Sequence, residues 1–124
     1  MGSTLKIIKE QVQGNVHITV FHLRGWLDMQ TEELLVAAAR DAYEEGSRYL
    51  LIDLAEVITL TSAGIRAMQK VYKIFTPQEE RSKFERVKLC NAPPQIYNVL
   101  GVTGFLLTIQ NYETMQAAID SFTE

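Results

Sequence analysis

The chain has 124 residues, 47% of them apolar, and we expect a single domain over residues 1–124 with a core of its own. Its net charge of −3 argues against nucleic acid as a partner, because proteins that bind nucleic acid usually present a basic field. No apolar run approaches the roughly 20 residues of a membrane span, so neither a membrane segment nor a signal peptide is expected.

The first third of the chain predicts a hairpin followed by a helix. Residues 5–11 and 16–23 are strand-like, and Gly14-Asn15 between them favours a two-residue turn. Thr31 is expected to cap the first helix, whose first turn carries two glutamates at the positive end of the helix dipole. Gly46 is expected to end that helix.

The middle of the chain predicts two strands around a second helix. Residues 48–54 are apolar almost throughout, as in a strand that is covered on both faces. A helical pattern runs from about Ser62 to Phe75, and residues 76–84 form the longest loop, which we expect to be mobile. The next strand covers 87–90, where the single cysteine has the setting of a buried small hydrophobe and suits a reducing cytoplasm.

The last part of the chain predicts two helices with a strand between them. The Pro93-Pro94 pair opens a short third helix that ends near Gly101. Residues 106–109 form the last predicted strand, and Asn111 is expected to cap the final helix. The order β-β-α-β-α-β-α-β-α predicts an α/β fold with a mixed sheet of four to five strands and four helices.

Ser62 stands where a strand and loop lead into the second helix, and two roles are open to it. It can be the N-cap, because serine is among the best residues at that position, and spacing alone favours this role. It can also be a phospho-acceptor at the end of a rigid surface helix.

Arrangements of residues that support catalysis are missing from the sequence. His17 and His22 lie five apart on one strand and therefore face opposite sides, so we expect them to be structural or solvated rather than to share a metal. Zinc spacings, a P-loop and a dinucleotide fingerprint are absent. Asp53 and Glu56 flank the predicted loop before the second helix, where a carboxylate pair is more often a loop cap than an acid/base dyad. We therefore expect neither enzymatic activity nor a cofactor.

Three runs of residues, in this order and at this spacing, resemble a known family. They are Leu23–Asp28 (LRGWLD), which is followed by Thr31, then Asp53–Val57 (DLAEV) and Thr61–Arg66 (TSAGIR). Together they resemble an STAS domain and, more narrowly, the stand-alone bacterial anti-sigma factor antagonists. The resemblance extends from about Leu5 to Phe122 and implies an STAS-like mixed sheet.

The resemblance also implies a phosphorylation switch in a cytoplasmic signalling pathway that regulates transcription. In the family, the serine at the position of Ser62 is phosphorylated by a GHKL-type kinase that is also the anti-sigma factor, and a PP2C-type phosphatase reverses this. The unphosphorylated antagonist binds the anti-sigma factor and frees the sigma factor, which is a partner-switching mechanism. The resemblance, rather than the spacing, favours Ser62 as the phospho-acceptor, with Thr61 in reserve.

The sequence departs from the family pattern on both sides of the acceptor. Well-known members have an acidic residue before the serine and a second serine after it, where this chain has Thr61 and Ala63. The residues expected to contact the partner are Trp26, Asp28, Thr61, Ser62, Ala63, Gly64 and Arg66.

Plainer roles stay open for several of these residues. Trp26, in the predicted loop after the second strand, can cover the end of the core, Asp28 can cap a turn, and Gly64 can allow close packing of the helix start. The basic stripe Arg66, Lys70 and Lys73 has the spacing of a solvated helix face.

A second function stays open because some STAS domains are not phosphorylated. The alternative is a scaffold or a module that senses a small molecule or nucleotide. A transporter tail is not expected, since the chain carries no membrane segment.

Overall fold

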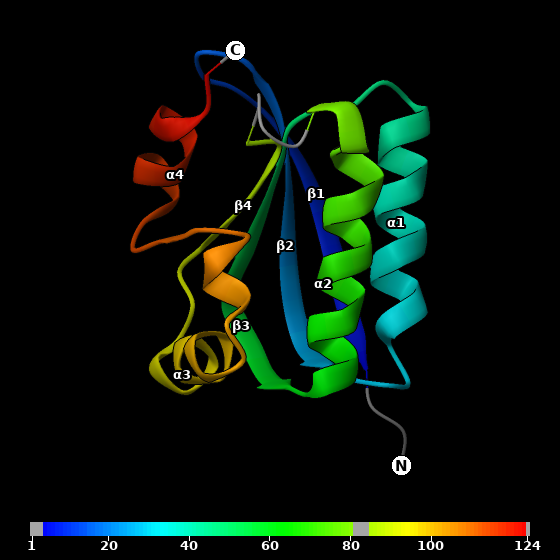
Figure 1. The fold of residues 1–124 in the computed structure, drawn as a ribbon, viewed down its shortest axis with the longest axis vertical. Coiled ribbons are helices and arrows are strands. Elements are labelled where there is room, and N and C mark those ends of the chain that lie inside the picture. Colours follow the sequence, from blue (N-terminus) through cyan, green and yellow to red (C-terminus); the bar gives the residue numbers. More distant parts are fainter. Residues whose placement is uncertain (1–3, 81–84, 124) are drawn as a thin grey trace.

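Figure 1 shows the computed structural model, which describes residues 4–80 and 85–123. The strands are β1 (Leu5–Gln13), β2 (His17–Leu27), β3 (Leu50–Leu60), β4 (Val87–Cys90) and β5 (Asn111–Tyr112). The helices are α1 (Glu32–Glu44), α2 (Ser62–Phe75), α3 (Pro94–Val102) and α4 (Met115–Ser121), with short 3-10 turns η1 (Gln78–Glu80) and η2 (Phe105–Leu107). The predicted order of strands and helices is confirmed.

The strands of the described chain form one mixed sheet in the order β1-β2-β3-β4-β5. β1 runs antiparallel to β2, whereas β2, β3, β4 and β5 pair in parallel. Parallel neighbours require a crossover connection, and α1, α2 and α3 each lie in one of these connections. The predicted α/β class and mixed sheet are confirmed.

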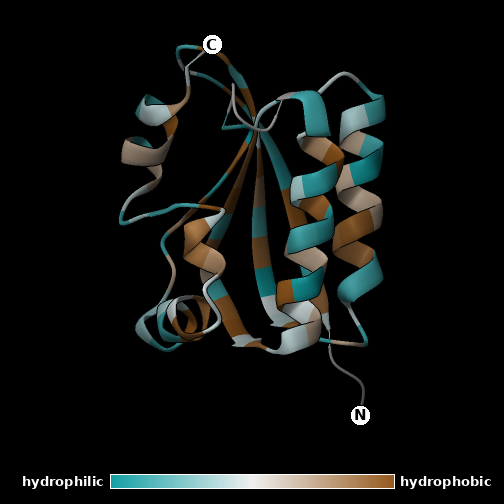
Figure 2. Ribbon diagram, in the orientation of Figure 1, coloured by the Kyte–Doolittle hydropathy of each residue, from teal (hydrophilic) through white to brown (hydrophobic). Residues whose placement is uncertain are grey.

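The helices cover the two faces of the sheet unequally. α1 and α2 lie side by side along one face, while α4 lies against the other face near one end (Figure 1). Apolar stretches follow the central strands between these layers (Figure 2). Leu50 and Ile52 belong to the core under α1 and α2, whereas Leu51 belongs to the smaller core under α4, and all three are fully buried. The prediction of a strand covered on both faces is therefore confirmed.

Cys90 packs in the core under α4 and is fully buried. Burial, and after it the nearby carboxylate of Asp53, raises the pKa of the Cys90 thiol to about 12. The thiol stays protonated at neutral pH, so the residue acts as the small hydrophobe that the sequence predicts.

The second and third strands are longer than the sequence predicts. The sequence predicts strands over residues 16–23 and 48–54, but β2 ends at Leu27 and β3 ends at Leu60. The parallel pairing of β2 with β3 continues to these ends across two register shifts near the end of β2. α4 does not reach this part of the sheet (Figure 1), so several outward-facing positions there, among them Arg24 and Glu56, are polar, and the continuous apolar pattern stops before the strands do.

Because β2 and β3 are longer than expected, three candidate residues lie in strands rather than in loops. Asp53 and Glu56 lie within β3, so their interpretation as loop caps is wrong. Trp26 lies in β2, not in the connection to α1. Glu56 forms an ion pair with Arg24 of β2, which joins the two strands on the surface.

Two connections also differ from expectation. The hairpin loop has three residues, Gly14–Val16, rather than two. The side-chain amide of Asn15 in this loop donates hydrogen bonds to the carbonyls of Asp120 and Phe122, at 3.2 and 3.3 Å. These bonds attach the loop to the end of α4. The predicted loop 76–84 contains the 3-10 turn η1, and its positions 81–84 lie outside the described residues.

The C-terminal predictions need two corrections. The expected strand 106–109 is wrong, because these residues follow Gly104 with a positive φ of 75° into η2. The strand comes later, as β5, where Asn111 pairs with Leu89. Asn111 therefore does not cap α4; Thr114 does, by accepting a hydrogen bond from the backbone N–H of Ala117 at 3.1 Å.

Candidate functional site at the start of helix α2

Ser62 is the first residue of α2 and is exposed, as the predicted placement requires. The N-cap position belongs to Thr61, which has an extended backbone (φ −108°, ψ 177°) and whose carbonyl accepts from the N–H of Ile65 at 3.0 Å. The N-cap interpretation of Ser62 is therefore wrong. The Thr61 side chain makes no capping hydrogen bond, and its buried Oγ1 has no partner in the described part of the chain. Ser62 thus lies beside first-turn N–H groups that carry the positive end of the helix dipole.

Gly64 brings the start of α2 against the end of β2. A Cβ atom at Gly64 would lie 2.6 Å from Leu60 Cδ1 and closer still to the carbonyl oxygen of Leu27. That same carbonyl accepts the N–H of Thr61 at 3.1 Å, so it fixes the turn that presents Ser62. The close-packing role of Gly64 is confirmed.

The connection from β2 to α1 is a hydrogen-bonded turn. Asp28 Oδ1 accepts from the N–H groups of Gln30 and Thr31, at 3.0 and 3.3 Å. Thr31 stands at the N-cap of α1, but its hydroxyl donates to the carbonyl of Trp26 at 2.7 Å and accepts from the N–H of Asp28 at 3.1 Å. Thr31 therefore locks the turn rather than capping the helix, and the turn role proposed for Asp28 is confirmed.

Large apolar side chains are exposed at the same end of the molecule. Trp26, Met29 and Ile58 are 43%, 76% and 61% exposed. They lie at the end of β2, in the turn after it and near the end of β3, and these two strand ends are paired side by side. Sequence reasoning missed Met29 and Ile58, although an apolar residue inside a turn is a usable signal. We call Trp26, Met29 and Ile58 the apolar rim.

The residues predicted to contact a partner differ in accessibility. Trp26, Ser62 and Arg66 are exposed, and Asp28 and Thr61 are half-buried. The side chain of Ala63 and the backbone of Gly64 are buried. These last two residues shape the helix start, and the predicted contacts of the remaining five stay a prediction.

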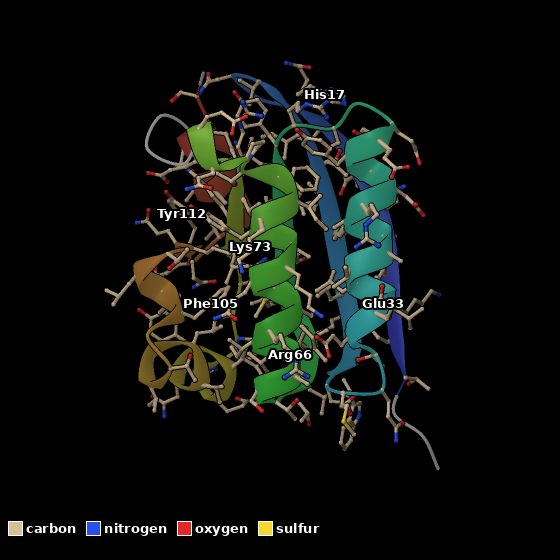
Figure 3. The ribbon with its side chains drawn as sticks, turned by 45° about the vertical axis from the view of Figure 1, so that its right-hand side comes forward. His17, Glu33, Arg66, Lys73, Phe105 and Tyr112 are labelled. Carbon is tan, nitrogen blue, oxygen red and sulfur yellow. The ribbon has the colours of Figure 1, made fainter. Side chains whose placement is uncertain are left out.

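The predicted basic stripe on α2 is only partly a solvated face, because α1 supplies a carboxylate to two of its members. Arg66 donates from Nε and Nη2 to the two carboxylate oxygens of Glu32, at 2.9 and 3.0 Å, and Lys70 donates to Oε2 at 3.1 Å. Hydrogen bonds from Arg66 and then Lys70 lower the pKa of Glu32 to about 2. Figure 3 shows Arg66 near the start of α2 and Lys73 further along it.

His22 joins three strands on the outer face of the sheet. Its Nδ1 lies 2.7 Å from Asp53 Oδ2 on β3, and its Nε2 lies 2.7 Å from Glu10 Oε1 on β1. Asn91, a non-glycine residue with a positive φ of 60°, donates to Asp53 Oδ1 at 3.1 Å. Burial lowers the pKa of His22, but the hydrogen bonds to Glu10 and Asp53 raise it by more, so the net pKa lies above its usual value. The histidine is a structural clamp, as expected.

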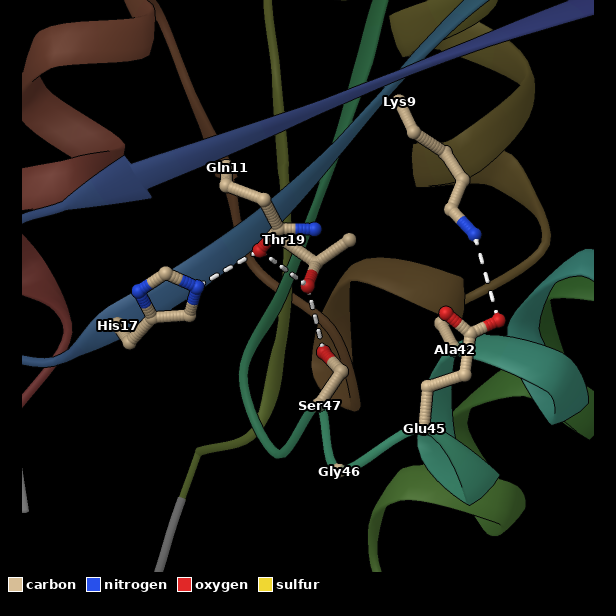
Figure 4. A pocket seen from close by; sticks show the side chains of 8 residues that line it. All are labelled: Lys9, Gln11, His17, Thr19, Ala42, Glu45, Gly46 and Ser47. Atoms are coloured by element: carbon tan, nitrogen blue, oxygen red, sulfur yellow. Dashed lines mark hydrogen bonds and ion pairs between the residues drawn. The ribbon is translucent and has the colours of Figure 1, made fainter.

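A second group of polar side chains lines a shallow pocket at the opposite end of the sheet (Figure 4). Gln11 Oε1 lies 2.7 Å from His17 Nε2 and accepts from the hydroxyl of Thr19 at 3.2 Å. Thr19 Oγ1 lies 2.7 Å from Ser47 Oγ. His17 is exposed, in line with the expected solvated role. These groups satisfy one another and lie far along the strands from Ser62.

Within residues 4–80 and 85–123, no helix is both long enough and apolar enough to cross a membrane.

Comparison with known proteins gives one family and several structures of similar fold. The family model for the STAS domain matches residues 9–118. The fold is similar to an anti-sigma factor antagonist from Mycobacterium paratuberculosis, with a TM-score of 0.80 and 22% identity over 96% of this chain and 94% of that one. A comparison with curated protein sequences gave no significant match.

Two structures of SpoIIAA are also similar. The anti-sigma factor antagonist SpoIIAA in its unphosphorylated form has a TM-score of 0.71 and 21% identity over 93% of this chain and 94% of that one. The Bacillus cell fate determinant SpoIIAA in the phosphorylated form has a TM-score of 0.64 and 20% identity over 93% and 97%. At these identities the likeness establishes the fold.

Proposed function

Because this chain belongs to the STAS domain family, we propose that it is a cytoplasmic anti-sigma factor antagonist switched by phosphorylation of Ser62. The unmodified chain binds a GHKL-type anti-sigma factor kinase, and this binding releases a sigma factor. The kinase transfers the γ-phosphoryl group of ATP to Ser62 Oγ, leaving ADP. A PP2C-type phosphatase hydrolyses the phosphoserine and restores binding.

The observation that carries this proposal is the exposed hydroxyl of Ser62 beside the apolar rim. A protein-binding surface needs side chains whose burial is favourable, and tryptophan and methionine are enriched in interfaces. Trp26, Met29 and Ile58 supply such side chains at the end of the molecule where Ser62 is exposed. The structural likeness to unphosphorylated and phosphorylated SpoIIAA is consistent with this use of the fold.

The physics of the switch follows from where Ser62 lies. Phosphate adds a charge of about −1.5 to −2 at neutral pH. At a helix N-terminus the dipole and free N–H groups stabilise that charge, so modification leaves the fold intact. A hydrated dianion on a surface that a partner must cover opposes binding, because burying a charge costs several kcal/mol. A loss of about 3 kcal/mol weakens affinity more than a hundredfold.

The test is to map the modified residue. Each GHKL-type anti-sigma factor kinase encoded in the same genome is incubated with the full chain and ATP, and the product is mapped by mass spectrometry. We expect one kinase to label Ser62, and the Ser62→Ala protein to lose the label. Thr61→Ala is the matched control, since it removes the neighbouring hydroxyl and should keep the label. A phosphate elsewhere in the chain, undiminished in Ser62→Ala, would refute the proposal.

A further inference from the structure

Arg66 follows Ser62 by one helical turn on the same side of α2. Residues four apart on a helix have Cβ atoms about 5–6 Å apart, and helical side chains lean toward the N-terminus. Arg66 therefore leans toward the residue that the kinase is proposed to modify. In the unmodified protein its guanidinium is held by the carboxylate of Glu32 through two hydrogen bonds, at 2.9 and 3.0 Å.

From this arrangement we infer that Arg66 is the positioning residue for the phosphate on Ser62, and that Glu32 of α1 competes with that phosphate for Arg66. This inference rests on the proposed function for its biological meaning. Its physical content is that one arginine lies between two anions, each at the start of a neighbouring helix.

The guanidinium has the donors and the freedom that this role requires. Arginine carries five N–H donors in a planar fork, and Glu32 engages two of them. The Arg66 side chain is 53% exposed, so it can turn without disturbing the core. A phosphate with nearly two negative charges attracts the fork more strongly than a carboxylate with one, and arginine suits bidentate binding to either group.

The carboxylate of Glu32 would keep a cationic partner when Arg66 turns toward the phosphate. Lys70 already donates to Glu32 Oε2 at 3.1 Å and can stay there when Arg66 turns away. Glu32 also lies in the first turn of α1, where the helix dipole favours a negative charge. With two cations for one carboxylate, this cluster has a surplus positive charge in the unmodified protein, and phosphate can use it.

The experiment titrates the phosphate itself. Phosphoserine is placed at position 62 of the full chain during translation, so that no kinase is needed, and the second pKa of the phosphate is read by phosphorus NMR. The free group titrates near pH 6. In Arg66→Gln we expect this pKa to rise by about 0.5 unit, less than the 1–3 units of a tightly paired group because Arg66 is half-exposed.

Three further variants sharpen the result. Glu32→Gln removes the competing carboxylate and should lower the phosphate pKa below that of the parent. Lys73→Gln removes a cation from the same helix three turns from Ser62 and should leave the pKa unchanged. Arg66→Lys restores the charge without the fork and should recover part of the shift. Nitrogen–proton correlation spectra verify that each variant is folded.

The inference is overturned when the titration curves of the parent and Arg66→Gln coincide, or when Lys73→Gln shifts the pKa as much as Arg66→Gln does. Failure of the proposed function would be seen elsewhere, as a kinase that does not label Ser62. The two results are independent, because the phosphate in this experiment is installed without the kinase.

Discussion

Replacing Gly64 by alanine tests how the start of α2 is held. The new Cβ would lie 2.6 Å from Leu60 Cδ1 and closer still to the carbonyl oxygen of Leu27, which is backbone and cannot rotate away. Overpacking of this kind costs typically about 1–3 kcal/mol. The higher helix propensity of alanine offsets about 1 kcal/mol of that cost. Because the clash is with backbone, we take the upper part of the overpacking range, about 2–3 kcal/mol, and expect a net loss of about 1–2 kcal/mol. This loss lowers the Tm by about 4–8 °C for a domain of this size.

Gly101→Ala is the matched control, because it makes the same exchange in α3, where an added Cβ meets nothing within 4 Å. Only the propensity gain remains there, so the free energy of unfolding should rise by about 0.5–1 kcal/mol. Thermal and urea unfolding of the three proteins measure both effects. If Gly64→Ala is as stable as the parent while Gly101→Ala is stabilised, the close approach of α2 to β2 is not the constraint described here.

The remaining predictions concern charge and access. Ser62→Asp should weaken the complex with the proposed anti-sigma factor in calorimetric titration. It should keep the Tm of the parent, because a carboxylate at a helix start is tolerated or favourable by about 0.3–1 kcal/mol. A Tm far below that of the parent would contradict this. Ser62→Ala should change stability by no more than about 0.5 kcal/mol in thermal melts, since Thr61 occupies the N-cap. The raised pKa of His22 means that its clamp stabilises the fold fully below about pH 6.5, and that this gain disappears as the pH rises through the folded-state pKa. The stability advantage of the parent over His22→Gln should therefore shrink as the pH rises above about 6.5, and an advantage that grows with pH would show the sign to be wrong. The Cys90 thiol should react with a thiol reagent only after unfolding, as an absorbance assay with and without denaturant would show, and rapid reaction in the native protein would contradict its burial.

Features set by local signals could be predicted from the sequence. The bounds of α2 follow from a hydroxyl residue at its start and a continuous amphipathic pattern to Phe75. α1 ends where Gly46 adopts a φ of 109°, which a residue without a side chain adopts at no cost. The strand through Leu50–Ile52 is evident because both of its faces are covered.

Features set by tertiary contacts could not be predicted in this way. The last residues of β3 are a strand because they pair with β2, although α4 does not cover them. Glu32 and Arg66 are 34 positions apart and meet only because α1 packs against α2. The apolar residues 106–109 look like a strand, yet Gly104 turns the chain into a 3-10 turn with Phe105 and Ile109 facing the core.

The most direct test of the proposed phosphorylation switch is the affinity of the full chain for the proposed anti-sigma factor partner with and without phosphate on Ser62. Titration calorimetry would use the kinase that labels the chain, with ATP omitted. Phosphoserine at position 123, an exposed site past the end of α4, controls for added charge alone. We predict a Kd more than about 100-fold higher for phosphate at position 62 and a Kd within about threefold of the parent for position 123. Equal affinities for the unmodified and Ser62-phosphorylated chains would contradict the account.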